Sequence, residues 1–196
     1  MSIIKKTSIE SADKFILENK QWGSEAYNIP VYAQIAYDEE GITVRFTVGE
    51  SNPQCDKKNH FEQVCLDSCV EFFVNFMPEK SDYYMNFEVN AAGTMNVSYR
   101  LDRHHSTRLL LEEVESFHIT PVIAEDHWTV TYKIGYDFIK KYYSGFDINS
   151  AKYVKCNIYK CGGLTEKRHF VTYFKIGTEK PDFHRPEYFG RVDIEA

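Results

Sequence analysis

The sequence predicts an all-β protein, an antiparallel, jelly-roll-like β-sandwich of about ten strands with one short helix. Apolar and polar residues alternate over most of the chain from residue 31 onward, which is the period of strands with one buried face. Tyr and Phe occur 14 times each and bring the aromatic share to 15%, and aromatic residues favour strands. Short turn sequences separate the alternating segments, as they do in other sandwich proteins.

The predicted strands cover residues 31–37, 42–48, 69–76, 83–90, 94–101, 117–123, 127–134, 153–160, 169–175 and 189–194. Three pairs of them flank short turns, at residues 38–41, 91–93 and 124–126, and are predicted to form hairpins. Only residues 136–143 show a helical pattern. No repeat, low-complexity tract or linker divides the chain, so residues 1–196 are predicted to form one domain.

The composition argues against several classes of partner. A formal net charge of −6 leaves no excess of cations to neutralise a phosphate backbone, so nucleic acid is not expected. No apolar run approaches the roughly 20 residues that a bilayer requires, so no membrane partner is expected. No apolar signal-peptide stretch follows Lys5 and Lys6. The five cysteines lack a framework spacing, which favours a reducing, cytoplasmic compartment, with secretion left open if the natural chain is longer.

Polar side chains share one face on several of the predicted strands. Asn86 and Glu88 alternate with apolar residues on one strand, and Glu71, Arg100 and Asn157 hold similar positions on others. An antiparallel sheet often keeps one face in water, which is the simplest explanation. Amides, carboxylates and an arginine are also the groups that make paired hydrogen bonds with hydroxyls, so the alternation leaves a solvated face and a binding face open.

Four segments, in order, resemble the family 9 carbohydrate-binding modules and their stand-alone relatives. Residues 67–73 read DSCVEFF, residues 84–90 YMNFEVN, residues 155–161 KCNIYKC and residues 181–190 PDFHRPEYFG. They are similar to the D-S-x-V-E-F-F, Y-x-N-F-E-x-N, N-x-Y-K and P-D-F-H-R-P-x-x-F-G segments of that family, and the likeness covers roughly residues 20 to 194.

The resemblance implies a β-sandwich that binds carbohydrate without cleaving it and serves carbohydrate catabolism, with xylan or glucan as candidate ligands. A mono- or oligosaccharide would lie in a slot, stacked on aromatic rings, with its hydroxyls bound by polar side chains. The expected ligand-binding residues are Arg45, Glu50, Asp67, Glu71, Asn86, Glu88, Arg100, Asn157, Lys160, Tyr173 and His184. They are expected to converge at one end or face of the sandwich, with Asp67 and Glu88 as candidates for orienting their neighbours.

The sequence departs from the family at its tryptophans. Family members commonly carry a Trp two residues before the D-S pair, where this chain has Cys65, and a later Trp where it has Tyr173. Trp128 alternates with apolar residues and is expected in the core, and Trp22 is expected to pack rather than to stack on sugar. Stacking is then expected from other rings, and the candidates are Phe61, Tyr173 and Phe183.

Two other functions remain open. Glu71 and Glu88 lie on the polar faces of successive strands and could approach the ~5–5.5 Å separation of a retaining glycoside hydrolase. Against that hypothesis, Arg45 and Arg100 are available partners that would lower the carboxyl pKa values and prevent general-acid catalysis. The replacement of the family Trp by Cys65 favours a third possibility, an interaction domain that has lost sugar binding.

The sequence predicts no cofactor and no catalytic metal. The spacings of Cys65/Cys69 and Cys156/Cys161 do not match zinc ribbons or knuckles, so buried thiols are expected. Structural calcium, which some members of the family carry, would need clustered oxygen ligands. The candidates for these are Glu50, Asp56 and Asp67.

Overall fold

A computed structural model describes residues 2–195, which contain fourteen strands and two α-helices. The strands are β1 (Ile4–Lys6), β2 (Lys14–Ile16), β3 (Asn19–Lys20), β4 (Val31–Tyr37), β5 (Gly41–Val48), β6 (Cys69–Asn75), β7 (Tyr84–Asn90), β8 (Met95–Arg100), β9 (Ser106–Arg108), β10 (Thr120–Ile123), β11 (Trp128–Gly135), β12 (Tyr153–Gly162), β13 (His169–Thr172) and β14 (Gly190–Glu195). The helices are α1 (Leu111–Glu115) and α2 (Tyr136–Tyr142).

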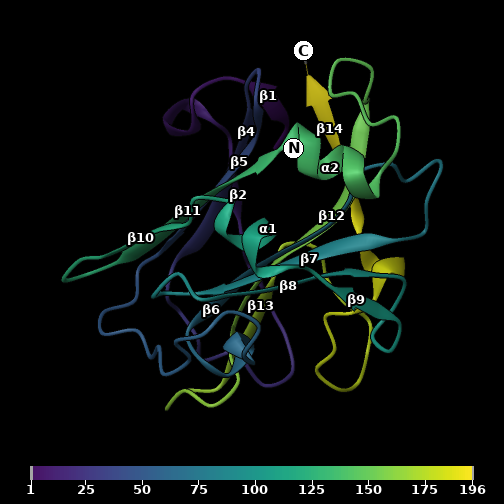
Figure 1. The fold of residues 1–196 in the computed structure, drawn as a ribbon. Coiled ribbons are helices and arrows are strands. Elements are labelled where there is room, and N and C mark those ends of the chain that lie inside the picture. Colours follow the sequence, from purple (N-terminus) through teal and green to yellow (C-terminus); the bar gives the residue numbers. More distant parts are fainter. Residues whose placement is uncertain (1, 196) are drawn as a thin grey trace.

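The strands follow one another in a single curled sheet in the order β10-β11-β5-β4-β1-β14-β12-β6-β7-β8-β9. The sheet curls so that β4, β5 and β11 form one layer and β6, β7, β8 and β12 the other (Figure 1). All neighbours are antiparallel except β1, which runs parallel to both β4 and β14 where the two layers join. The prediction of an antiparallel sheet is therefore confirmed for most pairs and wrong for β1, so the sheet is mixed.

The ten predicted strands correspond to the ten longest ones, and the structure adds β1, β2, β3 and β9. Each of these four spans two or three residues, too few to show an alternating pattern. The single predicted helix is α2, and the structure adds α1 within a segment without a predicted element. The Glu113 carboxylate accepts the Leu110 N–H at 2.7 Å and so caps the start of α1.

The main core lies between the two layers. The Phe87 ring of one layer stacks on the Tyr132 ring of the other with centroids 5.8 Å apart, and Phe117 packs on the edge of Phe87 at 5.6 Å. Trp128 is fully buried there, which confirms its predicted place in the core. Neither helix of residues 2–195 is long and apolar enough to cross a membrane.

A second, smaller apolar cluster covers the outer face of β6, β7 and β12. The Tyr159 and Phe183 rings stack at 4.1 Å, almost parallel, and Phe73 meets Tyr159 edge to face at 5.0 Å. Phe183 belongs to the irregular segment before β14, so this cluster fixes that segment over the sheet. The polar residues of the same strands lie beside it.

Candidate functional site

The candidate site is built on a pair of carboxylates at the centre of the outer face. Glu71 of β6 and Glu88 of β7 are register partners on adjacent antiparallel strands, so their side chains project side by side. They are only 2% and 4% exposed. Burial at this level means that each carboxylate depends on protein groups, or on a ligand, for its hydrogen bonds.

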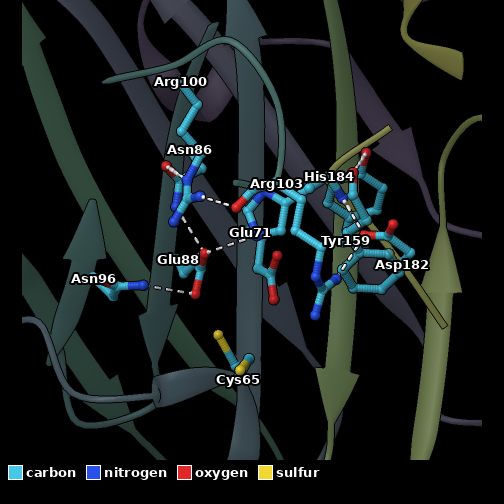
Figure 2. A network of polar contacts seen from close by, with 12 residues as sticks. Cys65, Glu71, Asn86, Glu88, Asn96, Arg100, Arg103, Tyr159, Asp182 and His184 are labelled. Atoms are coloured by element: carbon cyan, nitrogen blue, oxygen red, sulfur yellow. Dashed lines mark hydrogen bonds and ion pairs between the residues drawn. The ribbon is translucent and has the colours of Figure 1, made fainter. Parts of the chain in front are cut away.

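Amide side chains fix the orientation of Glu88. The Asn86 amide donates to one oxygen at 2.7 Å, and the Asn96 amide of β8 donates to the other at 3.1 Å. Arg100 in turn donates to the Asn86 carbonyl oxygen at 3.0 Å, so a chain of hydrogen bonds runs across β7 and β8 (Figure 2). Glu88 is therefore held in one position, whereas the one donor to Glu71 among residues 2–195 is the Cys161 thiol, at 3.1 Å.

The two carboxylates open into a hollow of about 540 Å³, a size suited to a small-molecule ligand. Four segments between strands surround it, before β6, after β8, after β12 and before β14. The lining residues are Cys65, Leu66, Glu71, Glu88, Arg103, Cys161, Gly163, Leu164, Arg168, Phe170, Pro181, Asp182, Phe183 and His184. Two carboxyl groups form the floor, and two arginines stand at the rim.

His184 links the segment before β14 to the carboxylate floor. Its Nδ1 is hydrogen-bonded to the Tyr84 hydroxyl at 3.0 Å, and its ring stacks on Phe73 with centroids 4.9 Å apart. Its Nε2 lies 3.9 Å from the Glu88 carboxylate. The neighbouring Asp182 accepts the His184 N–H at 3.1 Å and pairs with Arg103 at 2.7 Å, which connects the segment to the loop after β8 (Figure 2).

Burial dominates the electrostatics of the floor. It raises the pKa of Glu71 well above the ordinary value, and the adjacent Cys161 and Glu88 raise it further. Burial raises the pKa of Glu88 too, against the opposing effect of the Asn96 and Asn86 amides and of Arg100. The prediction that arginines would lower both carboxyl pKa values is wrong, because Arg100 bonds to Asn86 instead of a carboxylate and burial outweighs its charge.

His184 is held in its neutral form. Burial, together with the charges of Arg100 and Arg103, lowers its pKa to about 3. A neutral imidazole keeps one donor and one acceptor nitrogen, and the Tyr84 hydroxyl occupies Nδ1. His184 therefore presents one uncharged polar nitrogen toward the floor of the hollow.

The prediction of convergence is confirmed for Glu71, Asn86, Glu88, Arg100 and His184, which the hydrogen bonds and distances above bring together. It is wrong for Arg45, which lies in the other layer. The Arg45 guanidinium donates to Thr131 at 3.0 Å and pairs with the exposed Glu10 at 3.1 Å. It therefore cannot anchor Glu71.

The prediction of convergence is wrong for Glu50 and Lys160 as well, because both side chains lie on the core side of the sheet, opposite to the hollow. The Lys160 ammonium is fully buried, 2.7 Å from the His169 ring and 3.7 Å from Glu50. Glu50 also accepts from the Trp128 indole at 3.0 Å and from the Ser68 hydroxyl at 2.9 Å. These residues form a buried polar cluster inside the fold.

Asp67, Asn157 and Tyr173 lie outside the lining of the hollow, so the prediction of convergence is not confirmed for them. Asp67 accepts from the Lys57 N–H and the Asn90 amide, both at 2.9 Å, and holds the loop before β6. This agrees with the orienting role considered for it. Asn157 fixes the chain after β13 through both backbone groups of Phe174, each at 2.9 Å. The Tyr173 ring packs against neighbouring rings of the main core.

Of the three rings predicted to stack on sugar, only Phe183 lines the hollow. Trp22 packs edge to face on Phe170 at 5.7 Å and donates its indole N–H to the Thr178 carbonyl at 2.8 Å, as a packing residue does. Cys65 lies on the wall of the hollow, the place that the family resemblance gives to the replaced Trp (Figure 2).

Sequence reasoning missed part of the rim. Arg103, Arg168 and Phe170 line the hollow but lie in loops or at a strand end, where no alternating pattern marks them. Arg168 and Phe170 could have been found from their closeness to the N-x-Y-K strand, which they follow after one loop. Arg103 could have been found from its place at the end of the strand that contains Arg100.

The proposed calcium ligands do not form one group. Among residues 2–195, the one set of three His, Cys, Asp or Glu side chains with ligand atoms within 4.8 Å of one another is Cys69, Glu71 and Cys161. Asp67 does have one buried carboxylate oxygen without a donor in the described chain. Calcium therefore stays a prediction, for which Asp67 offers one free acceptor.

Solved structures share this fold. A protein of Bacteroides uniformis, provisionally described as carbohydrate-binding, is 24% identical with a TM-score of 0.81, over 100% of this chain and 98% of its own. A family 9 module of Caldicellulosiruptor kristjanssonii, solved with cellotriose, is 11% identical with a TM-score of 0.69, over 99% of this chain and 93% of its own. A family 9 module of the same organism, solved with glucose, is 11% identical with a TM-score of 0.68, over 98% of this chain and 94% of its own. No curated protein matches the chain.

The sequence profile of carbohydrate-binding family 9 matches residues 4–194, which is nearly all of the described chain. The match includes the strands of the carboxylate floor and the segment that carries His184. By its sequence over this whole length, the chain belongs to carbohydrate-binding family 9.

Proposed function

We propose that the protein binds a mono- or oligosaccharide in the hollow above Glu71 and Glu88 and does not cleave it. The observation that carries the proposal is the pair of buried carboxylates, set among oriented amides, at the floor of a ligand-sized hollow in a family 9 chain. Sugar hydroxyls would donate to these oxygens and replace the hydrogen bonds that the carboxylates have lost to burial.

The walls of the hollow suit the other features of a sugar. Phe170 and Phe183 offer aromatic surface to the C–H face of a pyranose ring, a contact that aromatic side chains commonly make in binding sites. Arg103 and Arg168 at the rim carry donors for ring and hydroxyl oxygens. Cys65 makes the wall less bulky than a Trp would, so we expect a shallow stack on one side only.

Glucose and short β-glucans are the first ligands to test, because two structural neighbours were solved with glucose and cellotriose. Xylan fragments are the second group. A role in carbohydrate catabolism follows from this ligand class. We also propose a reducing, cytoplasmic location, because none of the five cysteines forms a disulfide.

A glycan array, followed by calorimetry on each hit, tests the proposal. The expected result is saturable binding of at least one mono- or oligosaccharide, weakened when the Glu71 carboxylate is altered. A Kd of about 1 mM corresponds to a binding free energy of only ~4 kcal/mol. If no sugar binds even at this concentration, the result would support the interaction-domain alternative instead.

The raised carboxyl pKa values are an observation in favour of the second candidate function, glycoside hydrolysis by Glu71 and Glu88. A protonated Glu71 beside an ionisable Glu88 resembles a general acid and its partner. A glycosidase, however, needs its two carboxyl groups to flank the scissile bond. Here they project in the same direction from neighbouring strands, which suits two adjacent hydroxyls better.

A further inference from the structure

Beneath the hollow, the fold brings together two thiols that lie far apart in the sequence. Cys69 begins β6, and Cys161 lies near the end of β12, where the two are register partners on adjacent antiparallel strands. Both are fully buried and unpaired. Such partners project to the same side of a sheet with their Cβ atoms about 4.5–5.5 Å apart.

Glu71 completes a set of three. It lies two residues after Cys69 on β6, so its side chain projects from the same face, and the Cys161 thiol donates to its carboxylate at 3.1 Å. One ligand atom from each of the three side chains lies within 4.8 Å of the other two. A zinc ion with bonds of about 2.0–2.3 Å to sulfur and oxygen would fit among atoms with this spacing after small rotations.

The carboxylate of Glu71 lacks any other partner in the described chain. Its single donor is the Cys161 thiol, and no lysine or arginine pairs with it within residues 2–195. A buried carboxyl group in such a place either keeps a proton or binds a cation. This second observation points to a cation at the same position as the two thiols.

We propose that Cys69, Glu71 and Cys161 bind one thiophilic divalent cation, with zinc as the natural candidate. Two sulfurs and one carboxylate oxygen are three protein ligands, which leaves one position of a tetrahedral site open. Glu71 and Cys161 both line the hollow, so this open position faces the space where the proposed sugar would lie. Binding forms two metal–sulfur bonds and one metal–oxygen bond, and the protons held by the two thiols and by the Glu71 carboxyl group leave to solvent.

Cobalt(II) is the best probe, because thiolate ligands give it a charge-transfer absorption in the near ultraviolet. Full-length protein, reduced with a phosphine and freed of metal, is titrated with cobalt and then with zinc, without sugar. The expected result is one equivalent of bound cobalt with a thiolate band, which zinc displaces. Loss of a residue that only orients a metal ligand typically weakens metal affinity about 10- to 100-fold. Cys69→Ser and Cys161→Ser each remove a ligand and should therefore weaken cobalt binding by more than this.

Cys55→Ser is the matched control, because Cys55 lies in the loop before β6 and outside the proposed set. It should bind cobalt like the wild type. If the buried serine variants do not fold, Glu71→Gln decides the matter, because it keeps the shape of the side chain and removes one proposed ligand. It should weaken cobalt binding, whereas Cys55→Ser should not. Absence of a thiolate band at excess cobalt, or a band that survives in both serine variants, would overturn the proposal.

Discussion

Replacement of Glu71 by Gln tests the proposed binding site directly. The variant keeps the shape of the side chain and its acceptor oxygen toward Cys161, but it replaces the carboxyl group that would bind a sugar hydroxyl by an amide. Leaving a buried polar group without its hydrogen-bond partner costs about 1–3 kcal/mol. A cost of this size should weaken affinity about 5- to 150-fold, since 1.4 kcal/mol corresponds to a factor of ten.

Glu88→Gln should behave differently because of its two amide partners. Asn86 and Asn96 each donate to one oxygen of Glu88, and a Gln side chain has only one oxygen to offer. The amide N–H of the new Gln side chain then faces the amide N–H of one Asn, at a cost of about 1–3 kcal/mol of folding free energy. We therefore expect lower stability as well as weaker binding for this variant, whereas Glu71→Gln creates no such conflict between donors and should weaken binding without that cost.

The assay measures affinity by calorimetry and hydrolysis of aryl glycosides and of xylo- and cello-oligosaccharides on the same preparations. Glu10→Gln is the matched control, because Glu10 is exposed and pairs with Arg45 in the other layer. The expected outcome is weaker binding in both site variants, no effect in the control and no turnover in the wild type. Wild-type hydrolysis that disappears in either site variant would refute a non-catalytic site. Unchanged affinity in Glu71→Gln would place the sugar elsewhere.

Three further predictions concern the rim, the backbone and the pH profile. Phe170→Ala should weaken sugar affinity by about 1 kcal/mol, measured by calorimetry, because it removes an aromatic wall of the hollow; equal affinity would exclude stacking on Phe170. Gly190→Ala should lower stability by about 1–3 kcal/mol in urea unfolding, since a Cβ there would lie 2.3 Å from the Phe174 ring. Gly135→Ala, where the nearest atom is 3.9 Å away, is its control and should change little. Because burial raises the folded-state pKa of Glu71, the wild type should lose stability as pH rises above the ordinary value of 4.5, toward the folded-state pKa. In metal-free protein, Glu71→Gln should reduce this loss, to which the raised pKa of Glu88 also contributes, and parallel profiles would contradict the burial effect on Glu71.

The alternating pattern of the sequence was enough to predict the ten longer strands, the buried Trp128 and the row of polar residues with Glu71, Asn86 and Glu88. Alternation works here because the side chains of a strand point to opposite faces in turn, whatever the neighbouring strands are. The same rule applies to Lys160, which lies two positions after the core residue Ile158, so that its side chain points to the core face. The family motif suggested Lys160 as a ligand-binding residue, but its position in the alternation indicated the face opposite to the site.

Tertiary structure decided which polar residues meet. The alternation along its strand assigns Arg45 to an outer face of the sandwich, but only the strand order shows that this face belongs to the layer without the site. Cys69 and Cys161 are separated by almost half of the chain, and only the pairing of β6 with β12 brings their thiols together beside Glu71. The carboxyl pKa values likewise depend on burial by segments that arrive from distant parts of the sequence. These properties are set by long-range pairing, and local alternation carries no information about which strands become neighbours.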